Sequence, residues 1–161
     1  MSIRLRIRIK KLIDPELDLK LDYGELVRLS IQTLGKFNQN ASQLIRFKTK
    51  SGWSKLYEAI IDTGAHTSVI PRYIWEGIYV EEKVDHSVQG IVPKKECSLP
   101  VKVSNIRGVL FDDELNHTNE VEFYAFCAMS DRVPLILGFK SLLERFTICF
   151  NISSGIAYLE E

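Results

Sequence analysis

The stretch Ala59-Ile60-Ile61-Asp62-Thr63-Gly64-Ala65 decides the fold. An apolar run that ends in two isoleucines predicts a buried strand, and this strand leads directly into a carboxylate, Asp62. Gly64 permits a tight turn and the close approach of other backbone, and Ala65 is too small to obstruct a bound chain. The pattern therefore indicates an acid placed for chemistry at the end of a strand, although an Asp-Thr-Gly turn that only ends a strand is also common.

The composition is that of a single soluble globular domain of 161 residues, with 45% hydrophobic residues, 26% charged residues and a formal net charge of zero. Zero net charge provides no global field for nucleic acid or a membrane surface, and no apolar run reaches the roughly 18 residues of a membrane span. The three cysteines form no C-x-x-C pair and the three histidines share no metal-ligand spacing. We therefore expect no metal and no cofactor, and, without a signal-peptide pattern, a cytoplasmic protein.

The N-terminal residues 3–10 alternate strictly between apolar and basic side chains. A period of two predicts a half-buried strand with one basic face. That face either contacts a phosphate or an acidic partner, or is a solvated edge whose charges prevent aggregation. Residues 17–22 alternate in the same way and are mostly acidic on the polar face, so they are a candidate to pair with the basic strand.

Short β-type runs continue to the C-terminus without any β-α-β alternation, which predicts a mainly-β barrel or sandwich. Residues 50–53 are typical of a hairpin turn, and Pro71 can begin a short helix that ends near Trp75. Apolar residues at helical spacing in 139–146 predict one short helix near the C-terminus. Strands are predicted at residues 43–49, 54–61, 84–92, 98–103, 106–111, 121–129, 147–151 and 156–159.

A second apolar segment, Leu135-Ile136-Leu137-Gly138, lies far downstream of Asp62 and leads into the predicted C-terminal helix. With D-T-G-A and the hairpins on either side of it, this order resembles the retropepsin-like aspartic proteases, the clan of retroviral proteases and their single-lobe cellular relatives. The resemblance implies a closed acid-protease barrel with one short C-terminal helix, assembled as a homodimer. It implies a protease domain over residues 42–161, preceded by a β-rich N-terminal extension over residues 1–41.

The resemblance also implies the parts of an active site. Asp62 would be the catalytic residue. Thr63 would hydrogen-bond across the dimer, Gly64 would contact the main chain of the substrate, and Gly138 would pack behind the active loop. Relatives with serine in place of Ala65 bring a hydroxyl that favours the ionised acids, so this chain would work at mildly acid to neutral pH.

A flap hairpin over the site is a further part that the resemblance implies. Gln89, Gly90 and Ile91 would lie near its tip, and the flap would close over an extended peptide and exclude water. Flaps of the family are usually rich in glycine at the tip. Residues 87–93 depart from this, since they contain one glycine and one proline.

An aspartic peptidase needs two carboxylates that share one proton, one to activate water and one to polarise the scissile carbonyl. This chain has one D-T-G and no internal repeat, and Asp112, Asp113 and Asp131 are not followed by Thr-Gly or Ser-Gly. The second carboxylate must therefore come from another copy of the chain across a two-fold axis. The expected activity is an aspartic endopeptidase that acts on polypeptides through Asp62 of each of two chains.

Two other functions are compatible with the sequence. One is a non-catalytic module for protein binding or dimerisation on the same fold, with the basic N-terminal strand recruiting a partner. The other is a barrel that binds phosphate or RNA through the basic residues of 4–11. Against the latter, no aromatic residues interleave with these bases as a nucleic-acid groove would require.

Overall fold

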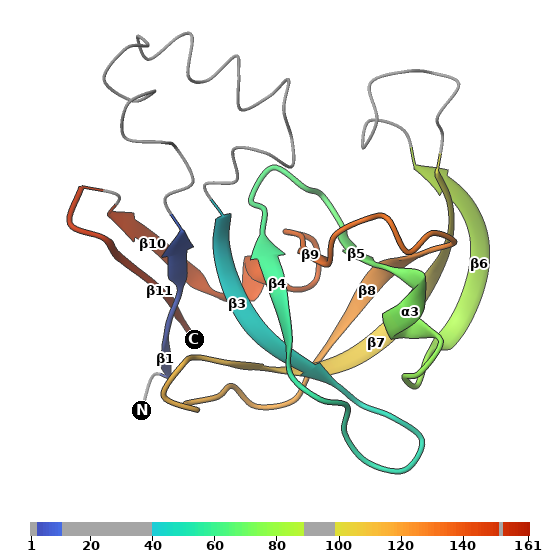
Figure 1. Cartoon of the computed structure of the whole chain (residues 1–161), viewed down its shortest axis with the longest axis horizontal. Helices are drawn as coiled ribbons and strands as arrows, with labels where there is room; N and C mark the ends of the chain where they lie inside the picture. The colour runs from blue at the N-terminus through green and yellow to red at the C-terminus, as the bar shows by residue number, and fades with distance from the viewer. Residues whose placement is uncertain (1–2, 11–39, 89–98, 152) are drawn as a thin grey trace, which may run out of the picture.

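The computed structural model describes residues 3–10, 40–88, 99–151 and 153–161, and it is mainly β (Figure 1). The predicted strand at 17–22 lies outside the described residues. Within the described residues the helical elements are α3 (Arg72–Trp75) and one 3-10 turn, η2 (Leu143–Arg145). The strands are β1 (Arg4–Arg6), β2 (Arg8–Lys10), β3 (Asn40–Phe47), β4 (Tyr57–Ile61), β5 (Ser68–Ile70), β6 (Glu81–Val88), β7 (Leu99–Phe111), β8 (Val121–Ala128), β9 (Ile136–Leu137), β10 (Thr147–Asn151) and β11 (Ile156–Glu160).

Strands β3, β4, β9, β5, β8 and β7 close into a barrel, because each pairs with the next and β7 pairs back onto β3. Strand β2 pairs with β3 and β6 with β7, so both extend the sheet beyond the barrel. The predicted mainly-β closed barrel is confirmed. Among the helices of the described residues, none is long and apolar enough to cross a membrane.

The core fills the barrel with side chains that alternate along the strands. On β8, Val121, Phe123 and Ala125 are buried whereas the residues between them are exposed. This is the period of two expected for a strand with one face in the core. Phe47 and Phe123 are among the largest fully buried side chains. Full burial of each such side chain contributes about 1.5–3 kcal/mol to folding.

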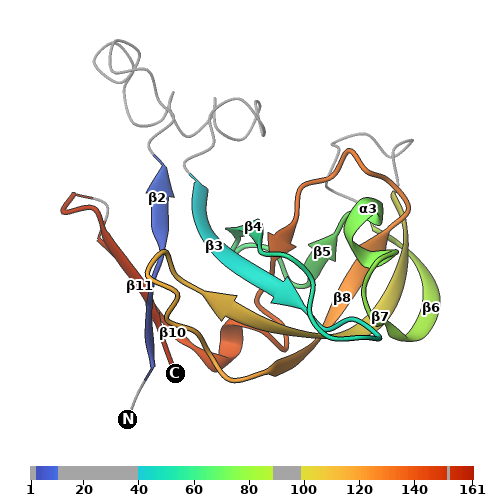
Figure 2. The same ribbon diagram turned by 60° about the horizontal axis from the view of Figure 1, so that its bottom comes forward.

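The N-terminal run forms the predicted half-buried strand but divides between two sheets. Strand β1 pairs with β11 in a three-stranded sheet completed by β10, and β2 pairs with β3 of the barrel (Figure 2). Leu5 and Ile7 are buried in the same core as the barrel residues, and Arg4 and Arg6 are exposed. The Ile7 N–H donates to Ala157 O at 2.9 Å. Residues 3–10, called the N-terminal arm below, therefore join the C-terminal hairpin of β10 and β11 to the barrel.

Two local predictions were wrong. The runs 98–103 and 106–111 form one strand, β7, because Ser104 and Asn105 between them also pair with residues of β8. The predicted helix over 139–146 is reduced to the 3-10 turn η2. Ser141 has a φ of 62°, which is outside the helical region, and the N–H of Glu144 donates to Phe139 O, five residues back, instead of to the carbonyl four residues back that an α-helix requires. The short helix after Pro71 is present as α3.

Candidate active site

Asp62 begins the loop that connects β4 to β5, two strands that are separated in the sheet by β9 (Figure 1). Strand β9 runs parallel to β4 and antiparallel to β5. The Asp62 N–H donates to Leu137 O at 3.0 Å, and the Ile60 N–H donates to Leu135 O at 2.9 Å. The segment around β9 therefore fixes the end of β4, where the acid lies.

The Asp62 carboxylate is oriented by the backbone of its own loop. Its Oδ1 accepts the N–H of Gly64 at 2.9 Å and the N–H of Ala65 at 3.2 Å. Charge-assisted bonds of this kind are stronger than neutral ones and limit the rotation of the carboxylate. Asp62 and Ala65 are half-buried, and Thr63 and Gly64 are exposed. The face of the loop beside Asp62 is thus open in the single chain.

Gly138 lies against Thr67 and Ser68, where the same loop enters β5. A Cβ at this position would be 2.4 Å from the Thr67 carbonyl carbon and 2.6 Å from the Ser68 nitrogen, closer than real Cβ contacts occur. Backbone hydrogen bonds join the two segments: the N–H of Phe139 donates to Ala65 O at 2.8 Å and the N–H of Lys140 to His66 O at 2.7 Å. Only glycine fits this packing.

Sequence reasoning missed Ser68, which completes this contact. Its Oγ accepts the Gly138 N–H at 2.9 Å, and the residue is fully buried. The signal available in the sequence is a serine directly before Val69 and Ile70, where an apolar residue would be expected in a buried strand.

The predicted flap residues Gln89, Gly90 and Ile91 lie outside the described residues. The strands that lead to them are described. Strands β6 and β7 pair antiparallel as far as Val88 and Leu99, which is the arrangement of a hairpin stem.

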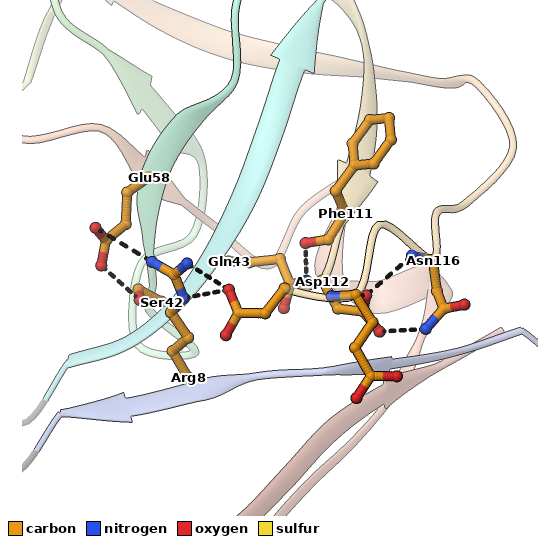
Figure 3. A network of polar contacts seen from close by, with 9 residues as sticks. Arg8, Ser42, Gln43, Glu58, Phe111, Asp112 and Asn116 are labelled. Carbon is orange, nitrogen blue, oxygen red and sulfur yellow. Dashed lines mark hydrogen bonds and ion pairs between the residues drawn. The ribbon is translucent and has the colours of Figure 1, made fainter.

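The arginines of the N-terminal arm are paired with acids of the same chain. Arg4 pairs with Glu160 at 3.1 Å and Arg6 with Glu114 at 3.4 Å. Arg8 contacts both Asp113 and Glu58 (Figure 3). These pairs favour the interpretation of a solvated, neutralised edge over a phosphate-binding or RNA-binding face.

The ion pair between Arg8 and Asp113 also shifts the pKa of both side chains. The hydrogen bond from Arg8 holds the pKa of the Asp113 carboxyl below its ordinary value, and the same bond raises the pKa of Arg8. Both side chains are well exposed, so the pair contributes little to stability. In the part of the chain that the structure describes, no group of three or more His, Cys, Asp or Glu residues could hold a metal ion.

Comparison with known proteins identifies the family of the chain. The family model of the retroviral aspartyl proteases matches residues 27–145, so the chain belongs to this family of retropepsin-like aspartic proteases. Among solved structures, the EIAV protease complexed with the inhibitor HBY-793 is similar, with 16% sequence identity over 63% of this chain and 83% of that chain and a TM-score of 0.41. No curated protein sequence matches the chain.

Proposed function

We propose that the protein is an aspartic endopeptidase whose active site forms between two copies of the chain, each supplying Asp62. The observation that supports this best is the placement of that acid. It lies at the end of β4, oriented through Oδ1 by the N–H groups of Gly64 and Ala65, and β9 and Gly138 support its loop from behind. Membership of the retroviral aspartyl protease family gives the same expectation.

Two acids that might supply the second carboxylate within one chain, Asp112 and Asp113, are engaged elsewhere. Asp112 is buried and accepts the N–H groups of Glu114 and Asn116 and the Asn116 side-chain amide, so it caps its own loop (Figure 3). Asp113 pairs with Arg8. A second copy of Asp62 is therefore the simplest source, and the exposed Thr63 and Gly64 beside it are available to a partner chain.

The shared site would hold one proton between its two acids. Two carboxylates about 3 Å apart repel by roughly 5 kcal/mol if both ionise at an effective dielectric constant near 20. One acid therefore stays protonated at working pH while the other is ionised. The two acids then have the different roles that peptide hydrolysis requires.

In the proposed reaction a water molecule between the acids attacks the carbonyl carbon of the scissile bond. The ionised Asp62 takes a proton from this water as the new C–O bond forms, and the protonated Asp62 of the partner subunit donates a hydrogen bond to the carbonyl oxygen. A proton then passes to the leaving nitrogen and the C–N bond breaks. The products are a carboxylic acid and an amine, and one water is consumed.

The remaining parts of the proposal concern the substrate and the domain. The substrate is a polypeptide bound in extended form, and Gln89, Gly90 and Ile91 belong to the flap that closes over it. The catalytic unit spans residues 42–161, and the extension over residues 1–41 contributes β1 and β2 to its sheets. Asp62, Thr63, Gly64, Ala65 and Gly138 form the active loop and its support.

The test is digestion of a peptide library by the purified protein, with and without pepstatin, together with measurement of the molar mass in solution. Wild-type protein should be a dimer that cleaves peptides. Asp62→Asn should remain a folded dimer without cleavage, whereas Asp131→Asn, a matched change at an exposed acid, should retain activity. Cleavage by Asp62→Asn would refute the proposal, and a folded wild-type dimer that cleaves nothing would favour a non-catalytic binding module.

A further inference from the structure

Ser68 is a buried polar residue at the start of β5, and its hydroxyl joins two segments that are far apart in sequence. The residue has 0% exposure, and its Oγ accepts the Gly138 N–H at 2.9 Å. The residues that follow it, Val69 and Ile70, are buried and apolar. A hydroxyl in such surroundings is costly to bury unless it is hydrogen-bonded.

The Ser68 contact lies at the beginning of a chain of hydrogen bonds that ends at the active loop. Directly after Gly138, the N–H groups of Phe139 and Lys140 donate to Ala65 O and His66 O. Ala65 in turn donates its own N–H to Asp62 Oδ1. The position of residues 138–140 therefore determines how the loop that orients the carboxylate is supported.

We infer that Ser68 is a positioning residue for Asp62: its hydroxyl fixes Gly138, so that residues 139 and 140 support the loop in the geometry that the shared site needs. This inference rests on the proposed endopeptidase function. Without the acceptor, the buried Gly138 N–H would be left unpartnered and residues 138–140 would move away from the loop. Displacement of a catalytic acid by about 1 Å can lower a rate by as much as 100-fold.

Ser104 offers a matched control within the same part of the sheet. Ser68 on β5 and Ser104 on β7 both lie opposite Ala125 of β8, one on each side. Ser104 is also buried, with 1% exposure, but its Oγ has no hydrogen-bond partner among the described residues. The two serines therefore have the same side chain and the same burial and differ in the bond to Gly138.

The experiment compares Ser68→Ala with Ser104→Ala in the full chain. Peptide cleavage is measured as kcat and KM, and hydrogen exchange is measured at the Gly138 amide. Ser68→Ala should lower kcat on the order of 10-fold with KM changed by less than about 2-fold, and it should speed exchange at Gly138. Ser104→Ala should leave all three quantities near those of the wild type.

Equal kcat values and equal Gly138 exchange in the two variants would overturn the inference. If Ser68→Ala does not fold, Ser68→Cys replaces it, since a thiol of similar shape is a weaker acceptor. The kcat of Ser68→Cys should then lie below that of the wild type. An unchanged kcat would contradict the positioning role of Ser68. Wild-type protein without any cleavage would instead refute the proposed function, and the exchange measurement would still test the hydrogen bond itself.

Discussion

Replacement of Gly138 by alanine tests the packing behind the active loop, and its cost can be worked out from the structure. The new Cβ would lie 2.4 Å from Thr67 C, 2.6 Å from Ser68 N and 2.7 Å from Thr67 O, all of them backbone atoms. Carbon atoms in contact are normally about 3.5–4 Å apart, so the two segments must separate by about 1 Å. No side-chain rotation can relieve this contact.

That separation removes hydrogen bonds as well as creating strain. The bond from Gly138 to Ser68 Oγ, at 2.9 Å, and the bonds from Phe139 and Lys140 to the loop, at 2.8 and 2.7 Å, would lengthen beyond hydrogen-bonding distance. At a net value of about 1 kcal/mol for each bond, together with overpacking strain of about 1–3 kcal/mol, the variant should lose about 4 kcal/mol or more. This is a large part of the roughly 5–15 kcal/mol that stabilises a typical domain.

The assay is urea unfolding of Gly138→Ala beside Gly77→Ala, with peptide cleavage measured on the same samples. At Gly77 an added Cβ meets Ile74 O at an ordinary 3.6 Å, so this control should change the free energy of unfolding by less than about 1 kcal/mol. Gly138→Ala should be strongly destabilised and, where still folded, inactive. A Gly138→Ala protein as stable and active as the Gly77→Ala control would refute the packing argument.

Three further predictions address the dimer, the N-terminal arm and the pH profile. Thr63→Val should weaken the dimer by about 2 kcal/mol in sedimentation equilibrium, because the two-fold axis makes each chain lose its Thr63 hydrogen bond across the dimer. Thr63→Ser keeps the hydroxyl and should not weaken the dimer. Equal dimer affinities of the two variants would contradict the proposed role of Thr63. Asp113→Asn should lower the free energy of unfolding by less than about 1 kcal/mol at neutral pH. Because Arg8 depresses the pKa of Asp113, this difference should shrink as the pH falls below the ordinary aspartate value of 3.8 and disappear once the pH is below the depressed pKa. A difference that persists in stronger acid would contradict the ion pair. With Ala65 beside the dyad, kcat/KM should peak at mildly acid to neutral pH and Ala65→Ser should extend activity to lower pH; a sharp optimum in strong acid would argue against this.

The sequence predicts the parts of the fold that depend on local patterns. Alternation along 3–10 predicts a half-buried strand, which the structure divides into β1 and β2, and the predicted strand at 121–129 is β8. The apolar run before Asp62 predicts a strand that ends at the acid, and β4 ends at Ile61. Each of these patterns is a consequence of one face packing on a core.

Features that depend on contacts between distant segments could not be predicted in this way. The spacing of apolar residues in 139–146 is helical, but the positive φ of Ser141 interrupts the helix, and the segment is held by contacts with the distant residues Ala65 and His66. Ser68 stands out in the sequence only as a serine before two apolar residues, and its partner Gly138 lies 70 residues away, so its role could not be predicted. The pairing of β1 with β11 likewise joins the two ends of the described chain, a separation at which no local pattern gives information.

The most direct test of a shared active site is to mix wild-type protein with Asp62→Asn, unfold the mixture and refold it so that chains pair at random. With equal amounts, about a quarter of the dimers contain two intact acids, so cleavage should fall to about a quarter of that of wild-type protein at the same total concentration. Excess Asp62→Asn should lower the activity further, in proportion to the square of the fraction of wild-type chains. Activity of about half, in simple proportion to the wild-type chains present, would show that each chain acts alone and would contradict the dyad.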